Sequence, residues 1–154
     1  MDRQALVIAG LRAVLNKLSW LNGQEMKVAF EGLSASEVHC IEHIGDHQDA
    51  NVTRLAEALY QTRGGISKIT KKLLRKGIIE GYQRADNRKE VYFRLTPQGE
   101  AVHRTHAKLH EAFRARDQAV FDRMTEAQFG IILDFLGQYG RHLDSEIAKQ
   151  NRKP

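Results

Sequence analysis

Two stretches of the chain place hydrophobic residues every three or four positions, which is the period of an α-helix. The first, between residues 5 and 21, carries its apolar stripe at Leu11, Val14, Leu15, Leu18 and Leu21. The second follows residue 128 and carries its stripe at Phe129, Ile132, Leu133, Leu136, Leu143 and Ile147. Both patterns predict long amphipathic helices, and Gly23 and Gly32 are expected to interrupt the chain after the first one.

Capping residues predict where three shorter helices begin or end between these two stretches. The tetrapeptide SASE at residues 34–37 has the form of a capping box and opens a helix to about Asp46. Asn51 is placed to cap the short helix VTRLAEALY, and Thr62 to cap the next one, which is expected to end at Gly77. The positions expected to face inward in these two helices are Leu55, Leu59, Ile66, Ile69, Leu73 and Leu74.

After Gly77 the hydrophobic period changes to about two. Residues 78–84 and 90–95 (IIEGYQR and EVYFRL) favour β-strands, and the polar segment ADNRK separates them. The sequence therefore predicts a two-stranded hairpin with a basic tip.

Two further helices are predicted beyond the hairpin. Thr96 followed by Pro97 is typical of a helix start, and this helix is expected to reach about Arg123. TEAQ at residues 125–128 is a second capping box that opens the last helix. The predicted fold class is therefore mainly α with a small β-hairpin wing: a winged helix–turn–helix core between N- and C-terminal helices.

Positive charge is concentrated on this predicted core. The chain has a net charge of +5, and residues 62–94 contain ten Lys and Arg against three acidic residues. A basic middle is typical of a protein that binds a polyanion such as DNA, although a solvated lysine-rich helix has a similar composition. The single Cys40 excludes an internal disulfide and suits a reducing cytoplasm, and no stretch is apolar enough to span a membrane.

Three segments of the core resemble the MarR family of winged helix–turn–helix regulators: VTRLAEAL, RGGISKITKKLLRKGIIE and RADNRKEVYFRLTPQGE. The last is the most specific, because Asp86-x-Arg88 followed by Leu95-Thr96 and Gly99 is a hallmark of the family. The long helices on both sides of the core also match. The departure is Gly64-Gly65 near the start of the recognition helix, where each glycine costs about 0.8–1 kcal/mol relative to alanine.

The resemblance implies a cytoplasmic, dimeric, sequence-specific DNA-binding regulator, expected to be a repressor. Residues 1–30 would form an N-terminal dimerisation helix, residues 33–96 the DNA-binding core, and residues 97–150 C-terminal helices that complete the dimerisation region. A second copy is expected to cover the two apolar stripes, which exceed what a small winged helix needs for its own core. Such a dimer presents two recognition helices ~34–36 Å apart and predicts a pseudo-palindromic operator.

The candidate DNA contacts lie on the recognition helix and the wing. Arg63 can offer a bidentate fork to a guanine edge, and Arg88 would enter the minor groove. Asp86 cannot attract DNA, so it is expected to hold an arginine in place; the alternative for Asp86 and Arg88 is an ordinary turn salt bridge. The full candidate set is Thr62, Arg63, Ser67, Lys68, Lys71, Arg84, Asp86, Arg88 and Lys89.

Three histidines occur in eight positions of the predicted helix after the wing, in HRTHAKLH at residues 103–110. His106 and His110 have the i, i+4 spacing with which helices bind zinc. His103 and His110 are about 10.5 Å apart along the helix axis, too far to share an ion. His39, His43 and His47 show that the same spacing also arises elsewhere in this chain by chance.

This histidine pattern resembles the metal site of a zinc-sensing branch of the MarR family, the streptococcal adhesin/competence-type repressors. The resemblance implies a Zn²⁺ site formed by Glu25, His39, His106 and His110, with the metal acting as co-repressor. The glutamate that precedes the histidine pair in that branch is Thr105 here, so a second, auxiliary metal site is not expected.

Other functions are compatible with parts of the sequence. The family default is a small aromatic or phenolic effector that releases the regulator from DNA, in a pocket that Trp20, Phe30 and Tyr82 could line. Cys40 could be a redox switch, but its neighbours favour a buried apolar role. A zinc hydrolase with Glu25 or Glu42 as its base is disfavoured, because the chain lacks HExxH, a nucleophile elbow and a phosphate-binding glycine loop. The chain is therefore not expected to be an enzyme.

Overall fold

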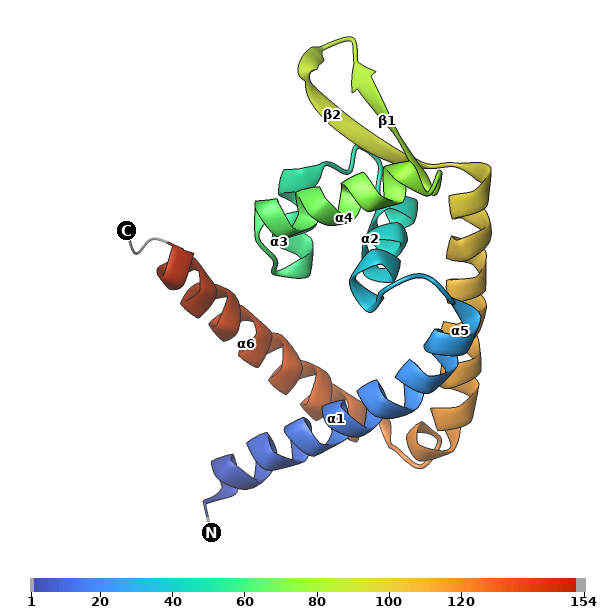
Figure 1. Ribbon diagram of the computed structural model, residues 1–154. Coiled ribbons are helices and arrows are strands. Elements are labelled where there is room, and N and C mark those ends of the chain that lie inside the picture. The colour runs from blue at the N-terminus through green and yellow to red at the C-terminus, as the bar shows by residue number, and fades with distance from the viewer. Residues whose placement is uncertain (1, 152–154) are drawn as a thin grey trace. The chain divides into compact units, whose positions relative to one another are not determined.

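The computed structural model describes residues 2–151, and within them the chain forms helices and one two-stranded antiparallel sheet (Figure 1). The elements are α1 (Arg3–Ala29), α2 (Ala35–Asp46), α3 (Val52–Leu59), α4 (Arg63–Arg75), β1 (Ile79–Arg84), β2 (Asn87–Leu95), α5 (Pro97–Phe121) and α6 (Glu126–Asn151). This order confirms the predicted fold class, a mainly helical protein with a small β-hairpin.

The helices begin at the predicted capping residues. The Ser34 hydroxyl accepts a hydrogen bond from the Glu37 amide at 3.1 Å, and the Glu37 carboxylate accepts one from the Ser34 amide at 3.3 Å. The Asn51 side chain caps α3 by accepting a hydrogen bond from the Arg54 amide at 2.8 Å. The Thr62 hydroxyl caps α4 by accepting one from the Gly65 amide at 3.1 Å. These caps satisfy amides that have no partner inside the helix. The predicted end of α4 is also confirmed, since Gly77 has a φ of +69°.

Three local predictions were wrong. Gly23 does not break the first helix, because one glycine costs a helix only about 1 kcal/mol and α1 continues to Ala29; the break comes at Gly32, with a φ of +83°. The hairpin turn is shorter than ADNRK, because Arg84 already pairs with Asn87. Leu74 does not face inward: it is 40% exposed, whereas its neighbour Leu73 is fully buried.

The hydrophobic core fixes the orientation of α4. The largest fully buried side chains are Ile41, Leu55, Ile66, Leu73 and Cys40, which come from α2, α3 and α4. Ile79 and Phe93 bring the two strands into the same cluster. Ala50, between α2 and α3, pairs with Phe93 as an isolated bridge, so the helical part and the hairpin share one core.

The chain divides into two compact units, one up to residue 113 and the other from residue 114. The first holds α1 to α4, the hairpin and most of α5, and the second holds the end of α5 and α6. The sequence also predicts boundaries near residues 30 and 97, between the dimerisation helices and the DNA-binding core. These boundaries divide the chain by function and stay predictions. Within residues 2–151 no helix is both long enough and apolar enough to cross a lipid bilayer.

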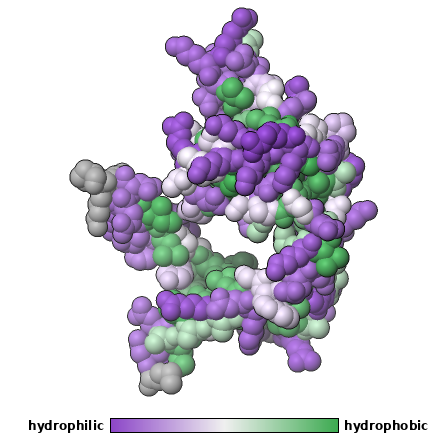
Figure 2. Space-filling model, viewed as in Figure 1, coloured by the Kyte–Doolittle hydropathy of each residue, from purple (hydrophilic) through white to green (hydrophobic). Residues whose placement is uncertain are grey.

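Helices α1 and α6 each carry apolar side chains but bury no residue in the described chain. The exposed apolar residues of α1 include Leu6, Val14, Leu15, Leu18 and Trp20. Those of α6 include Ile131, Ile132, Leu133, Leu136 and Leu143. Over the hairpin the surface is instead mostly hydrophilic (Figure 2).

Candidate nucleic-acid interface and histidine cluster

Helix α4 buries one side in the core and exposes the side that carries the predicted DNA contacts. Ile66, Thr70 and Leu73 are buried. The predicted DNA-contacting residues are on the open side: Thr62, Arg63, Lys68 and Lys71 are exposed, and Ser67 is half-buried. The capped N-terminal half of the helix therefore presents its cations and hydroxyls to solvent.

A shallow groove joins this half of α4 to the wing. Arg63, Gly64 and Ser67 line one side, and Lys89 from β2 lines the other. A Cβ at Gly64 would meet nothing within 4 Å, so no contact inside the chain requires a glycine there. The groove brings three of the predicted DNA-contacting residues together, on two elements.

The arginines of the wing differ in their surroundings. Arg84 donates to both oxygens of Asp86, from Nε at 2.9 Å and from Nη2 at 2.8 Å. Asp86 therefore holds an arginine, as expected, and that arginine is Arg84. The hydrogen bond and charge of Asp86, together with the charge of Asp49, raise the pKa of the Arg84 guanidinium. Arg88 is exposed on β2, and within residues 2–151 its side chain has no hydrogen bond or ion pair.

Lys76 binds two groups inside the protein, and the amino-acid sequence did not predict either contact. Its ammonium donates to the Glu37 carboxylate at 2.7 Å and to the Gly32 carbonyl at 2.9 Å. The partners lie 39 and 44 residues away in the chain, so no local pattern could have indicated the pair.

A cluster of imidazoles lies between α2 and α5. His106 is 4% exposed, and its Nε2 lies 3.1 Å from Nε2 of His110. The Glu42 carboxylate on α2 is 3.8 Å from the same His106 nitrogen. Burial lowers the pKa of His106 below its usual value, so the ring favours the neutral form that can bind a metal. Among the described residues, this trio is the one group of three such side chains whose ligand atoms all lie within 4.8 Å of one another.

Two of the four predicted metal ligands lie outside this trio. Glu25 is exposed on α1, and His39 is exposed on α2, one turn before Glu42. The structure therefore brings together His106 and His110 from the predicted set and adds Glu42, which sequence reasoning considered only as the base of a hydrolase. Its position on the same helix as His39 was the signal that could have indicated it.

A close contact between α2 and α5 flanks the cluster. His103 Nε2 lies 2.8 Å from the Asp46 carboxylate. A Cβ on Gly45 would collide with the His103 ring, so this glycine allows the close approach of the two helices. His43 and His47 stack on each other, with ring centroids 4.1 Å apart.

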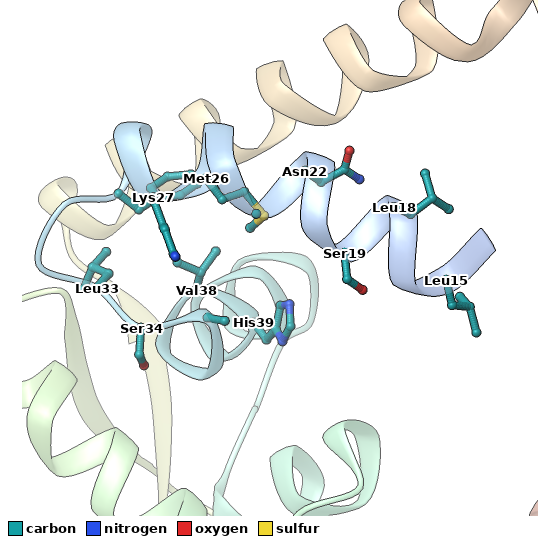
Figure 3. Close-up of a pocket in the computed structure, with 13 residues that line it drawn as sticks. Leu15, Leu18, Ser19, Asn22, Met26, Lys27, Leu33, Ser34, Val38 and His39 are labelled. Atoms are coloured by element: carbon teal, nitrogen blue, oxygen red, sulfur yellow. The ribbon is translucent and has the colours of Figure 1, made fainter. Parts of the chain in front are cut away.

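A pocket of about 480 Å³ lies between α1 and α2 (Figure 3). Its walls are mostly apolar, and Lys27 and His39 add polar groups. Phe30 lines it, as predicted. Trp20 and Tyr82 do not: Trp20 is 68% exposed, and Tyr82 lies on β1 against Asp49.

Cys40 is fully buried, and burial together with the charge of Glu37 raises the pKa of its thiol to about 11. A thiol with such a pKa forms almost no reactive thiolate at neutral pH. The predicted apolar role of this residue is confirmed.

The arrangement of a capped recognition helix, a short preceding helix and a cationic hairpin defines a winged helix–turn–helix transcriptional regulator. Comparison with known proteins identifies the kind. The model of the MarR family matches residues 33–91. The HTH-type transcriptional regulator YhjH of Bacillus subtilis strain 168 is 37% identical over 125 residues, covering 81% of this chain and 69% of that protein. The chain belongs to the MarR family.

Two further similarities agree with this assignment. PchR, another HTH-type transcriptional regulator of Bacillus subtilis strain 168, is 32% identical over 111 residues, covering 72% of this chain and 66% of that protein. The crystal structure of Streptococcus pneumoniae FabT in complex with DNA has a TM-score of 0.79 at 25% identity, covering 94% of this chain and 99% of that chain. The chain thus spans about two thirds of the length of these two Bacillus subtilis proteins. The family and these relatives are transcriptional regulators and not enzymes.

Proposed function

We propose that this protein binds double-stranded DNA as a homodimer and represses transcription from a pseudo-palindromic operator. The observation that carries the proposal is the groove that places Arg63 and Ser67 of α4 beside Lys89 of β2. Helix α4 would enter the major groove, and Arg88 would reach the neighbouring minor groove, where a guanidinium meets a strong negative potential. The similarity to the DNA-bound FabT structure supports the same mode of binding.

A second copy of the chain is the proposed cover for the apolar side chains of α1 and α6. Apolar surface of this extent is costly to leave in water, and a homodimer buries it symmetrically. Two recognition helices would then face two half-sites about one helical turn, ~34–36 Å, apart.

Fluorescence anisotropy with duplex DNA tests this function. Wild-type protein is titrated into a random-sequence duplex at several salt concentrations, and a preferred site is then selected from a random pool. We expect affinity to fall steeply with salt, because bound cations release counterions from DNA, and we expect an inverted repeat to emerge. Salt-independent or absent binding would contradict the proposal.

We further propose that Zn²⁺ modulates the DNA affinity, as a co-repressor held by His106 and His110. Two nitrogens bound to one tetrahedral zinc lie about 3.3 Å apart, close to the 3.1 Å between the two Nε2 atoms. Glu42 supports a carboxylate ligand at this position, while Glu25 and His39 remain the ligands implied by family resemblance. Because the ligands come from α2 and α5, binding would bias the position of one helix against the other.

Metal titrations separate these ligand sets. Purified wild-type protein is stripped of metal with a chelator and titrated with Zn²⁺ by calorimetry. The same titration is made with three variants: the His106→Ala/His110→Ala double variant, Glu42→Gln and Glu25→Gln. The double variant should lose binding and lose any effect of Zn²⁺ on DNA affinity. Weaker binding in Glu42→Gln alone assigns the carboxylate to α2, and weaker binding in Glu25→Gln alone assigns it to α1. Unchanged zinc response in the double variant would end the metal proposal.

The pocket between α1 and α2 favours a second candidate for the effector, a small aromatic or phenolic compound that releases the protein from DNA. Its apolar walls suit a ring, and Lys27 and His39 could bind an acidic substituent. Salicylate is a suitable probe: it should weaken DNA binding of wild-type protein and have less effect on Lys27→Met. An equal effect on both proteins would exclude this pocket as its site.

A further inference from the structure

An aspartate, Asp49, ties the turn between α2 and α3 to the hairpin. Its carboxylate accepts a hydrogen bond from the Tyr82 hydroxyl at 2.6 Å and another from Arg84 Nη1 at 2.9 Å. The Asp49 amide also donates to the Tyr82 hydroxyl at 3.2 Å. Both partners lie on β1, so this one side chain joins the helical part of the winged helix to its wing.

The backbone at this aspartate is held in an unusual conformation. Asp49 has a φ of +58°, in the left-handed region that most L-residues avoid. Its carbonyl accepts a hydrogen bond from Arg54 Nη1 at 2.7 Å. Such a conformation persists where the surrounding contacts fix it, and here those contacts are the bonds to Arg54, Tyr82 and Arg84.

The same network occupies all three nitrogens of Arg84. One is bound to Asp49 and two to Asp86, and the guanidinium carbon lies 5.8 Å from the centre of the Tyr92 ring. Three of the five N–H donors of Arg84, including the fork formed by Nε and Nη2, are therefore already bound within the protein, and two carboxylates balance its charge. In the described part of the wing, the cations that form no hydrogen bond or ion pair with the protein are Arg88 and Lys89.

We propose that Asp49 is a positioning residue for DNA binding, which acts through Tyr82 and Arg84 to hold the wing at the angle where Arg88 and α4 reach one duplex together. The proposal rests on the proposed DNA-binding function. It also moves Arg84 and Asp86 from the candidate DNA contacts to the support of the wing. A network spanning 33 to 35 residues of sequence, with its carboxylate only 27% exposed, is suited to fix one element against another.

The sign of the effect distinguishes this role from simple electrostatics. Removing a carboxylate near a DNA-binding surface makes the surface more positive, which by charge alone strengthens DNA binding. If Asp49 positions the wing, its removal weakens binding instead. Asn is the informative conservative replacement, because its amide oxygen can accept from Tyr82 or Arg84 and it tolerates a positive φ.

The experiment measures anisotropy with the duplex selected by wild-type protein and compares Asp49→Ala, Asp49→Asn and the control Glu57→Ala. Glu57 is an exposed acid on α3 that forms no hydrogen bond or ion pair with the wing in the described structure. We expect Asp49→Ala to bind about tenfold more weakly, Asp49→Asn to recover most of that loss, and Glu57→Ala to bind as tightly as wild type or more tightly. Thermal melting and gel filtration of each variant check that the fold and the oligomeric state are kept.

A double-mutant cycle with Arg88→Ala tests the route of the effect. If Asp49 acts by placing the wing, Asp49→Ala should cost little once Arg88 is already absent, so the two losses should not add. Hydroxyl-radical footprints of Asp49→Ala should lose protection at the flanks of the site and keep it at the centre, a difference that partial unfolding does not produce.

Each outcome has a separate meaning. Wild-type protein that selects and binds no duplex would overturn the proposed function itself. Wild-type binding with equal or tighter binding by Asp49→Ala would overturn only the positioning role, as would fully additive losses in the cycle. Weaker binding by a folded Asp49→Ala, with recovery in Asp49→Asn and non-additivity with Arg88→Ala, is the result that the proposal requires.

Discussion

Two arginines four positions apart in the wing have opposite surroundings. Arg84 donates hydrogen bonds to two carboxylates, whereas Arg88 forms no hydrogen bond or ion pair within residues 2–151. A charge that is already paired contributes little to attracting DNA, because its partner cancels its field. The pair is therefore a natural comparison for measuring what each arginine does.

Replacing Arg88 with alanine should weaken binding to the selected duplex about ten- to hundredfold and reduce the slope of log affinity against log salt concentration, since one phosphate or groove contact is lost. The thermal midpoint should not change, because the Arg88 side chain forms no hydrogen bond or ion pair in the described part of the chain. Anisotropy titrations at several salt concentrations measure both quantities. Wild-type affinity in this variant would contradict the placement of the wing in the minor groove.

The pair of Glu37 and Lys76 should make stability depend on acidity. Burial alone would raise the pKa of Glu37, but its hydrogen bonds to Lys76 and Ser34 and the lysine charge outweigh burial and hold that pKa below its usual 4.5. The stabilisation is therefore complete above pH 4.5 and lost as the pH falls through the lower, folded-state pKa. Glu37→Gln, which can keep the capping box, removes this contribution.

Urea unfolding of wild type and Glu37→Gln at pH 7 and at about pH 3 checks this prediction. The wild type should be more stable at pH 7, by an amount on the order of 1 kcal/mol, and the difference should shrink at the acidic pH. A constant difference between the two proteins at both values would show that Glu37 keeps its charge state, or that its ion pair contributes nothing.

At the scale of elements, the start of α4 combines a good cap with poor helix formers. The Thr62 cap is present, yet Gly64 follows with open space around it. A glycine that no internal contact requires leaves room for another molecule to approach the backbone. The open space is compatible with close approach of a phosphate and equally with a glycine that is merely tolerated.

Gly64→Ala separates these alternatives. Alanine should stabilise α4 by at most about 1 kcal/mol, because Gly64 lies in the first turn of the helix, and differential scanning calorimetry would show this as a higher thermal midpoint. DNA binding should become several-fold weaker if a phosphate approaches this backbone, because the added methyl group occupies that space. Higher stability with unchanged DNA affinity would mean that the glycine has no role in binding.

Local elements were predictable and distant pairings were not. The caps at Ser34, Asn51 and Thr62 depend on residues three positions apart, so the sequence shows them directly. The contact of Glu42 with His106 and that of Asp49 with Arg84 join segments far apart in the chain. Patterns of hydrophobic and capping residues carry no information about such pairs, which depend on how the helices pack.

At the scale of the whole molecule, the apolar faces of α1 and α6 link stability to assembly. Neither helix buries a residue in the described chain, and a helix without a packed face is marginal in water. A second copy is the proposed cover for both. The thermal midpoint should therefore rise with protein concentration, because association stabilises the folded state by mass action.

Circular dichroism melts over a hundredfold range of concentration, together with sedimentation velocity, test this expectation. A concentration-independent midpoint, with a monomer as the sedimenting species, would show that the chain folds without a partner. Leu15→Ser on α1 should lower the midpoint most at low concentration, where fewer chains are paired.

The proposed assignment of DNA contact to the wing and of pairing to α1 and α6 has a genetic consequence. A chain whose wing is defective, such as Arg88→Ala, still carries intact α1 and α6 and would still pair with normal chains in the same cell. In the proposed dimer, each mixed pair would contact its DNA site with one intact wing instead of two. A mutant copy supplied in excess should therefore behave as dominant over the normal one, and a mutant that cannot pair should behave as recessive.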